Sequence, residues 1–208
     1  MAEVPGLRER KKLRTRHALV AAALRLFMEK GYDQTTVSEI AAAVEVSTRT
    51  FFSYFASKED VLFHNSRAGL DLALRTVAER RHGEGAVDLL ARAVRSSLAG
   101  LPQDAGSRDE MTTINHLVMT VPSLRARALL LLFDTQRELA EALHEACPDE
   151  LGRTEAAAVV GAVAGAAKLA GFVSMNRGDP LERVLEDSIR AAEIALAGMR
   201  AVAAAPGR

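Results

Sequence analysis

The chain has 208 residues, of which 49% are hydrophobic, and its 27 basic residues balance 27 acidic ones. This length allows one large domain or two small ones, and zero net charge excludes a uniformly basic nucleic-acid binder, so any DNA-binding surface must be local. Cys147 is the only cysteine, which excludes an intrachain disulfide and fits a reducing cytosol. We interpret it as structural filler ahead of Pro148 rather than as a redox sensor.

The amino end carries the local basic excess. Residues 1–16 are rich in charge and have no apolar centre, so we expect no signal peptide. Such a cluster can neutralise phosphates, although it is also common in solvated tails. The basic residues are Arg8, Arg10, Lys11, Lys12, Arg14 and Arg16, with Glu9 as the only acid among them.

A long amphipathic helix is predicted from about Arg10 to Lys30. Gly31 should end this helix, because glycine readily takes the left-handed conformation that closes a helix, and Tyr32 should pack back over the junction. The apolar stripe consists of Leu19, Ala22, Ala23, Leu26 and Phe27.

Residues 36–58 contain three helix-start signals within about twenty residues. Thr36 followed by Glu39 forms a capping box, Ser47 precedes a second helix, and Ser57 with Asp60 opens a third. Two short helices joined by a tight turn are typical of a helix-turn-helix, whose second helix can enter the DNA major groove.

The apolar residues of this segment divide between a core face and a free face. Val37, Ile40, Ala41 and Val44 share one face of the first short helix, and Val46 should close the turn from below. Phe51 and Phe55 share the core face of the second helix. The residues left pointing elsewhere are Thr48, Arg49, Thr50, Phe52 and Ser53.

From about Arg16 to Leu62 the sequence resembles the TetR-type bacterial transcriptional regulators. The stretches that carry the resemblance are AAALRLFMEKGYDQTTVSEIAAAVEVS, the recognition segment TRTFFSYF and the closing SKEDVL. The remaining two thirds of the chain is similar to the family only in length and helical character.

The resemblance implies roles for individual residues at a DNA surface. It places Thr36 and Tyr54 against phosphates, Ser47 as the cap of the recognition helix, and Lys58 as a clamp on the DNA backbone. Arg49 is the best candidate for base contact, since Arg bound to guanine is the commonest specific pairing. The full predicted set is Thr36, Ser47, Thr48, Arg49, Thr50, Phe52, Ser53, Tyr54 and Lys58.

Two positions depart from the family pattern. Glu45 occupies the turn where the family usually has glycine, so the turn must take a positive φ without glycine or adopt a variant geometry. Phe52 replaces the commoner tyrosine and loses a phosphate hydrogen bond. Its ring can either touch a thymine methyl in the groove or pack on the first helix, and the sequence leaves both readings open.

The middle of the chain reads as helix throughout. We predict helices at 58–81, 86–98, 108–120 and 123–146, separated by glycine and proline, and no alternating strand pattern occurs. The expected fold is all-α, with a helix-turn-helix domain at residues 1–57, a helical ligand-binding and dimerisation domain at 58–202 and a tail at 203–208. The breakers are Gly83, Gly85, Gly100, Pro102, Pro122 and Pro148.

The resemblance also implies a pocket for a mostly apolar small molecule. The middle helices offer an apolar stripe with one amide, and methionine side chains suit an adaptable pocket. For any single residue, ordinary core packing is the competing interpretation. The nominated lining residues are Met111, Asn115, Val118, Met119, Phe133, Arg137, Phe172 and Met175, with Ile114 on the same stripe. His64 and His116 lack metal-ligand spacing, and we predict no metal and no cofactor.

The segment 156–173 is almost entirely apolar, with Lys168 as its one charge. A membrane span is disfavoured, because alanine and glycine dominate the segment and Lys168 would lie inside the span. Small residues instead favour close packing between helices of two subunits. The resemblance implies that this segment and a final helix at 180–202 pair with their symmetry mates, which predicts a homodimer interface containing Gly161, Gly165, Lys168, Ile189 and Leu196.

Catalytic motifs are absent from the sequence, so we predict that the chain is not an enzyme. The expected function is a cytoplasmic, ligand-responsive transcriptional regulator that represses by binding double-stranded DNA at an inverted-repeat operator. The alternative is a helical DNA-binding architectural or adaptor protein that responds to no small molecule.

Overall fold

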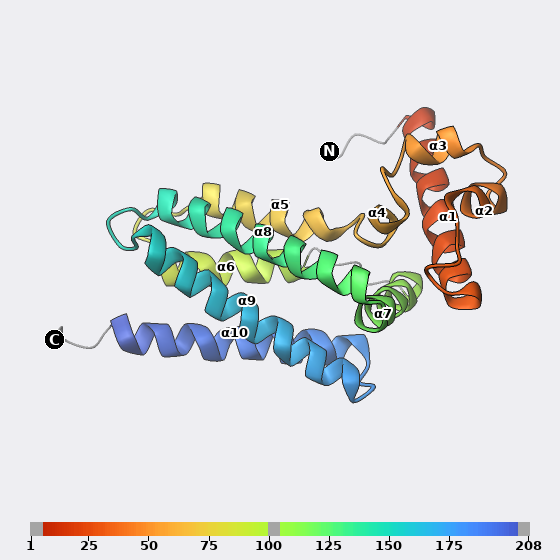
Figure 1. The fold of residues 1–208 in the computed structure, drawn as a ribbon. Helices are drawn as coiled ribbons and strands as arrows, with labels where there is room; N and C mark the ends of the chain where they lie inside the picture. The colour runs from red at the N-terminus through yellow and green to blue at the C-terminus, as the bar shows by residue number, and fades with distance from the viewer. Residues whose placement is uncertain (1–5, 100–104, 204–208) are drawn as a thin grey trace. The chain divides into compact units, whose positions relative to one another are not determined.

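A computed structural model of the chain describes residues 6–99 and 105–203. Within these ranges every regular element is a helix, and there are ten of them (Figure 1). The predicted all-α class is confirmed. The predicted breakers Gly100 and Pro102 and the predicted tail from residue 204 onward lie outside the described residues.

The chain divides into two compact units. The first comprises residues 1–65 and 104–128, and the second comprises residues 66–103 and 129–208. The first unit therefore runs past the domain limit predicted at residue 57, and it includes a second stretch of chain that the sequence assigned to the ligand domain. The functional division into DNA-binding and ligand-binding domains stays a prediction.

Unit 1 is built on α1 (Leu7–Lys30), with three short helices beside it in Figure 1. These are α2 (Val37–Ala43), α3 (Thr48–Phe52) and α4 (Lys58–Leu62). Gly31 closes α1 with φ 90°, and its N–H donates to the Phe27 carbonyl over 3.0 Å. Tyr32 packs back against Phe27 with ring centroids 5.1 Å apart, as predicted.

Helix α7 (Ala105–Thr120) supplies the rest of the unit 1 core. Leu117 and Val118 of α7, with Leu124 from the first turn of the next helix, share one buried cluster with residues of α1, α2, α3 and α4. Helices as short as α2 and α3 bury little surface by themselves, so this additional cover enlarges a small core. The other fully buried side chains of the cluster include Leu19, Ile40, Phe51 and Val61.

The turn between α2 and α3 has the geometry that ends many helices. The Glu45 N–H donates to the Ala42 carbonyl and the Val46 N–H to the Ala41 carbonyl, each over 3.0 Å, which is the Schellman pattern. This pattern requires a left-handed residue after the cap, and Glu45 supplies it with φ 56°. The first alternative predicted for this turn is therefore the one adopted, and Val46 packs beneath it against the core.

The predicted helix at 58–81 is wrong in one respect, because the chain breaks it at residues 63–65. Helix α4 ends at Leu62, three residues separate it from α5 (Ser66–Ala78), and α5 stops before Arg81. At the break the His64 carbonyl accepts a hydrogen bond from Arg16 Nη2 over 3.0 Å. That contact comes from a residue 48 positions away, so helical spacing alone does not reveal it.

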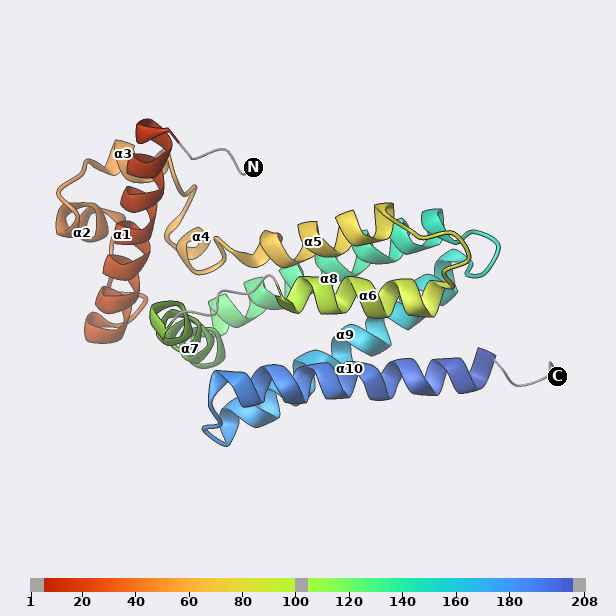
Figure 2. The ribbon, with the colours of Figure 1, turned by 180° about the vertical axis from the view of Figure 1, so that it is seen from behind.

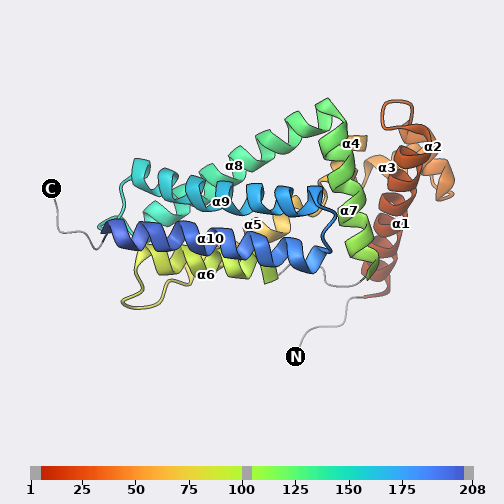
Figure 3. The same ribbon diagram turned by 90° about the horizontal axis from the view of Figure 1, so that it is seen from below.

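Unit 2 is a bundle of α5, α6 (Ala86–Ala99), α8 (Pro122–Ala146) from residue 129 onward, α9 (Arg153–Asn176) and α10 (Leu181–Ala203). Its core joins Leu89 and Leu90 of α6, Leu143 of α8 and Val163 of α9 with apolar residues of α5 and α10. Figure 3 shows α9 next to α10, with which it is in contact.

Helices α9 and α10 lie against each other (Figure 2), and a glycine of α9 is part of this contact. A Cβ atom built on Gly171 would lie 2.7 Å from Ser188 Oγ, so a larger residue here would force Ser188 to move. A Cβ atom built on Gly161 or Gly165 would have no neighbouring atom within 4 Å. The close packing predicted from small residues thus occurs within the chain at Gly171, and the other two glycines are left on an open face.

Glu45→Gly should stabilise unit 1 by about 1 kcal/mol, because a left-handed conformation strains a residue that carries a Cβ atom. Urea unfolding of the purified protein measures this change. Glu45→Ala is the matched control, since it removes the same carboxylate and keeps the strain. Equal stabilities of the two variants would show that the turn is unstrained.

Candidate nucleic-acid interface

Three side-chain caps fix the ends of the short helices. Thr36 Oγ1 accepts from the Glu39 N–H over 3.3 Å, and Glu39 Oε2 accepts from the Thr36 N–H over 2.9 Å, which completes the predicted capping box. Ser47 Oγ accepts from the Thr50 N–H over 3.1 Å. Ser57 Oγ accepts from the Asp60 N–H over 3.3 Å. All three predicted caps are confirmed, and they satisfy N–H groups that short helices leave unpaired.

Glu39 carries a further constraint. Hydrogen bonds from Lys30 and from the Thr36 backbone and hydroxyl lower the pKa of Glu39 to about 2. Its carboxylate therefore stays ionised near neutral pH, where it holds both the cap of α2 and the end of α1. A carboxylate in the first turn also suits the positive end of the helix dipole.

Helix α3 presents its polar residues to solvent and its aromatic face to the core. Thr48 and Arg49 are exposed, while Phe51 is fully buried and Phe55 is 4% exposed. Ser53 is exposed as well, although its hydroxyl donates to the Thr50 carbonyl over 2.6 Å. The predicted split between core face and free face is therefore present, except that Thr50 is half-buried and Phe55 lies beyond the end of α3.

Phe52 lies on the free side with 55% of its surface exposed. Its ring forms an edge-to-face pair with the Phe51 ring, with centroids 5.6 Å apart and planes at 89°. A phenylalanine side chain this exposed lacks the stabilising free energy that burial of its apolar surface would give. Of the two readings that the sequence left open, this geometry favours an apolar contact made on the outside of α3.

Lys58 is held by the protein itself. Its ammonium donates to the Tyr32 carbonyl over 2.8 Å and to the Thr35 carbonyl over 3.2 Å, and it lies 4.2 Å from the centre of the Tyr32 ring. The Tyr32 hydroxyl in turn donates to Glu59. Lys58 therefore fixes the turn that leads into Thr36. The contact with DNA that the resemblance implies for Lys58 stays a prediction, as does that of the half-buried Tyr54.

The basic cluster of the amino end lies on the first turns of α1, which begins earlier than predicted. Residues 8–14 are all exposed there. Five of these seven residues are Arg or Lys, so they form a helical cationic surface in unit 1. Such a surface can contact phosphates without reading sequence.

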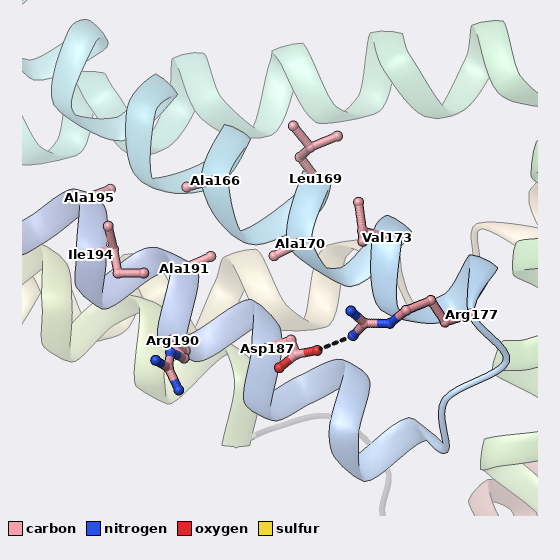
Figure 4. Close-up of a pocket in the computed structure, with 10 residues that line it drawn as sticks. All are labelled: Ala166, Leu169, Ala170, Val173, Arg177, Asp187, Arg190, Ala191, Ile194 and Ala195. Carbon is pink, nitrogen blue, oxygen red and sulfur yellow. Dashed lines mark hydrogen bonds and ion pairs between the residues drawn. The ribbon is translucent and has the colours of Figure 1, made fainter.

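A groove in unit 2 forms a second candidate surface (Figure 4). It lies between α9 and α10 and has a volume of about 560 Å³. Leu169 and Ile194 are 64% and 66% exposed on its walls, and an Arg177–Asp187 ion pair of 2.9 Å lies at one end. The lining residues are Ala166, Leu169, Ala170, Val173, Arg177, Asp187, Arg190, Ala191, Ile194 and Ala195.

The residues predicted for the dimer interface occupy different environments. Gly165 and Lys168 are exposed, and Gly161 and Ile189 are half-buried. Leu196 is 3% exposed and belongs to the core of unit 2, so we remove it from the interface set. Sequence reasoning missed Leu169 and Ile194, although both are large apolar residues on helices already proposed to pair.

The predicted ligand-pocket residues are divided between the two units. Val118 is buried in the unit 1 core and Met119 packs against it, while Met111 and Asn115 are half-buried on the same helix. In unit 2, Phe133 and Arg137 are exposed on α8, and Phe172 and Met175 are half-buried on α9. None of the eight lines the α9–α10 groove. Val118 thus has the core role that was the competing interpretation, and a ligand site at the remaining positions stays a prediction.

Two further features bear on the chemistry of the chain. Cys147 is 1% exposed, and burial raises the pKa of its thiol, which disfavours the reactive thiolate. Among the described residues, no three His, Cys, Asp or Glu side chains are grouped so that they could hold a metal ion.

Within the same residues, α9 is long and apolar enough to cross a membrane, with a mean hydropathy of 1.8. One such helix is weak evidence for a membrane span. In this structure one face of α9 packs on α10 and another lines the groove.

Comparison with known proteins points to one family. The family model described as "Bacterial regulatory proteins, tetR family" matches residues 19–64, which run from within α1 to the end of the α4 segment. The transcriptional regulator TcmR of Streptomyces glaucescens is 46% identical over 94 residues, which are 45% of this chain and 42% of TcmR. HbdR of Aromatoleum sp. (strain CIB) is 43% identical over 56 residues, which are 27% of this chain and 24% of HbdR.

The matched regions are therefore less than half the length of these relatives. The likeness to solved structures extends further along the chain. A structure of a SmeT–triclosan complex has a TM-score of 0.62 at 16% identity, covering 89% of this chain and 91% of that one. At this identity the likeness shows a common fold, and that fold includes the helices that follow the matched domain.

Lys58→Met should destabilise unit 1 by about 1–3 kcal/mol, because two carbonyl groups of the Tyr32–Thr35 turn lose their donor. Lys30→Met is the matched control, since Lys30 forms an exposed pair with Glu39 that is worth less than about 1 kcal/mol. Urea unfolding measures both changes. Equal losses would show that the Lys58 contacts contribute no more than a surface ion pair.

Proposed function

We propose that the chain, whose amino-terminal domain matches the TetR family of bacterial regulatory proteins, is a ligand-responsive transcriptional repressor that binds an inverted-repeat operator as a homodimer. The observation that carries this proposal is the exposed, capped helix α3, which presents Thr48, Arg49 and Phe52 away from a core formed by Phe51. A regulator of this kind would act on DNA in the bacterial cytoplasm.

The polar groups of α3 suit the edges of bases in the major groove. Arginine can donate two hydrogen bonds to guanine, threonine hydroxyls pair with several bases, and an exposed phenyl ring can touch a thymine methyl. Phosphate contacts would come from Thr36 at the start of α2 and from the cationic first turns of α1. Contacts of this second kind set position and affinity rather than sequence preference.

Dimerisation would follow from the α9–α10 groove. Leu169, Val173 and Ile194 expose apolar surface on its walls, and Gly161 and Gly165 leave space on the same helix for another backbone to approach. A two-fold axis through this surface would place one α3 helix per subunit on the DNA. For helix-turn-helix dimers the half-sites lie about 34–36 Å apart, or a multiple of that distance.

A small molecule releases such a repressor only if it binds the released state more tightly than the DNA-bound state. Nearly complete release needs a preference of about 5 kcal/mol, and partial release needs less. We propose a mostly apolar effector. The partly buried methionine and aromatic residues on α7 and α9 that the sequence nominated support this class.

Selection of bound sequences from a random DNA pool tests the proposed function without knowledge of the effector. The purified protein should enrich an inverted repeat. Failure of a folded dimer to enrich any sequence in low salt would contradict the repressor proposal.

Arg49→Ala should weaken binding to the selected operator about tenfold or more, since one bidentate base contact contributes about 1–3 kcal/mol of discrimination. Binding to unrelated DNA should change little. Arg25→Ala on α1 is the control, because Arg25 is exposed and pairs with Glu29 in the same helix. Equal losses on operator and unrelated DNA would exclude Arg49 from sequence reading.

Ile194→Glu should convert the dimer to monomer at micromolar concentration, because it places a charge in the apolar groove that the partner subunit would cover. Sedimentation velocity measures the change. Met28→Glu is the matched control, since Met28 is 53% exposed on α1 in unit 1. A dimer that survives Ile194→Glu would place the interface elsewhere.

A further inference from the structure

The break between α4 and α5 brings three segments of unit 1 together at one histidine. The His64 side chain is only 5% exposed, and its ring meets the Phe55 ring edge-on at 6.4 Å. Its backbone carbonyl accepts from Arg16 of α1, and its ring faces Glu110 of α7. His64 therefore contacts α1, α7 and the segment that carries the recognition helix. It lies in the break at residues 63–65, where the predicted helix 58–81 is interrupted.

The hydrogen bonds of the imidazole determine its neutral form. Nδ1 lies 2.7 Å from the Val61 carbonyl, and a carbonyl can only accept, so Nδ1 carries the hydrogen. In the neutral ring Nε2 is then an acceptor, and it lies 3.6 Å from the Glu110 carboxylate oxygen. While the ring is neutral, two hydrogen-bond acceptors therefore face each other, His64 Nε2 and the Glu110 carboxylate oxygen. Protonation of Nε2 turns this contact into an ion pair between α7 and the end of α4.

The surroundings of His64 keep this proton off near neutral pH. Burial lowers the pKa of His64, and Arg16 and His17 of α1 lower it further, whereas the Val61 carbonyl and Glu110 raise it. The Nε atom of Arg16 is itself buried and has no hydrogen-bond partner in the structure. A positive charge at His64 is thus opposed from α1 and favoured from α7.

We propose that His64 is a proton-dependent positioning residue that, when protonated, ties α7 to the end of α4 through Glu110 and thereby changes operator binding. The second half of this proposal rests on the proposed function. A second ion pair also connects α4 to the later segment of unit 1. Asp60 of α4 lies 3.9 Å from Arg127 in the part of α8 that belongs to unit 1. His64 also lies one residue before the end of the first segment of this unit.

The link between His64 and Glu110 is tested first without DNA, by following the imidazole signals of the full chain during an NMR pH titration. In Glu110→Gln the pKa of His64 should be lower than in the wild type, because the carboxylate that favours the charged ring is gone. Glu29→Gln removes a carboxylate of α1 that pairs with Arg25, and it should leave the titration unchanged. An unchanged His64 titration in Glu110→Gln overturns the proposal.

The effect on DNA is tested by measuring operator affinity at pH 5.0 and pH 8.0. Wild-type protein and Glu110→Gln should differ about threefold or more in the ratio of the two affinities, as expected for directly coupled groups. His64→Asn can keep the hydrogen bond to Val61 and lacks Nε2, so it should reproduce the profile of Glu110→Gln. Superimposable profiles of wild type and both variants overturn the link to operator binding. If no operator is recovered by selection, the repressor proposal fails while the NMR titration still decides whether His64 and Glu110 interact.

Discussion

The burial of Phe51 beneath a five-residue helix is the constraint on which the candidate DNA surface depends. An isolated helix of this length is unstable in water, since its nucleation cost exceeds what one turn of hydrogen bonds returns. Helix α3 persists because Phe51 packs among Ile40, Val61 and the α1 stripe, and because Ser47 caps its first turn. The exposed positions of Arg49 and Phe52 follow from that anchor, because residues one or two positions from a buried residue on a helix point to other faces.

The features of unit 1 that the sequence predicted correctly are local ones. A capping box, a glycine that ends a helix and two phenylalanines four residues apart each depend on neighbours within a few positions. The strained turn at Glu45 was also within reach, because a four-residue connection with a Schellman ending requires a left-handed residue whatever its side chain. The break at residues 63–65 was not, since it depends on Arg16, which is distant in the sequence. The same limit hid the packing of Leu117 and Val118 beside α1.

In unit 2 the sequence predicted the two long helices but not which of their small and apolar residues are buried within the chain. Small residues recur along α9, and composition cannot distinguish a glycine packed inside the chain from one on an open surface. The structure separates them, because Gly171 is required by the contact with Ser188 while Gly161 and Gly165 meet nothing. Leu196 shows the converse, since its helical spacing matches that of Ile189 yet it lies in the core. Knowledge of which helix lies against α9 is needed to assign these faces.

The division into units also constrains how an effector can act on DNA binding. Helix α8 belongs to unit 1 up to Ala128 and to unit 2 from Leu129, and the chain also passes between the units at Asn65–Ser66. An effector bound among unit 2 residues such as Phe172 must therefore change unit 1 through connections of this kind, and it does so only to the extent that it prefers one arrangement of them over another. An effector that contacted Met111 or Asn115 on α7 would instead act on a helix whose neighbours, Leu117 and Val118, are packed in the same core as Phe51. In that case the energetic path to α3 is a set of van der Waals contacts already present in the structure, and Glu110 of α7 lies 3.6 Å from His64 in the break between α4 and α5.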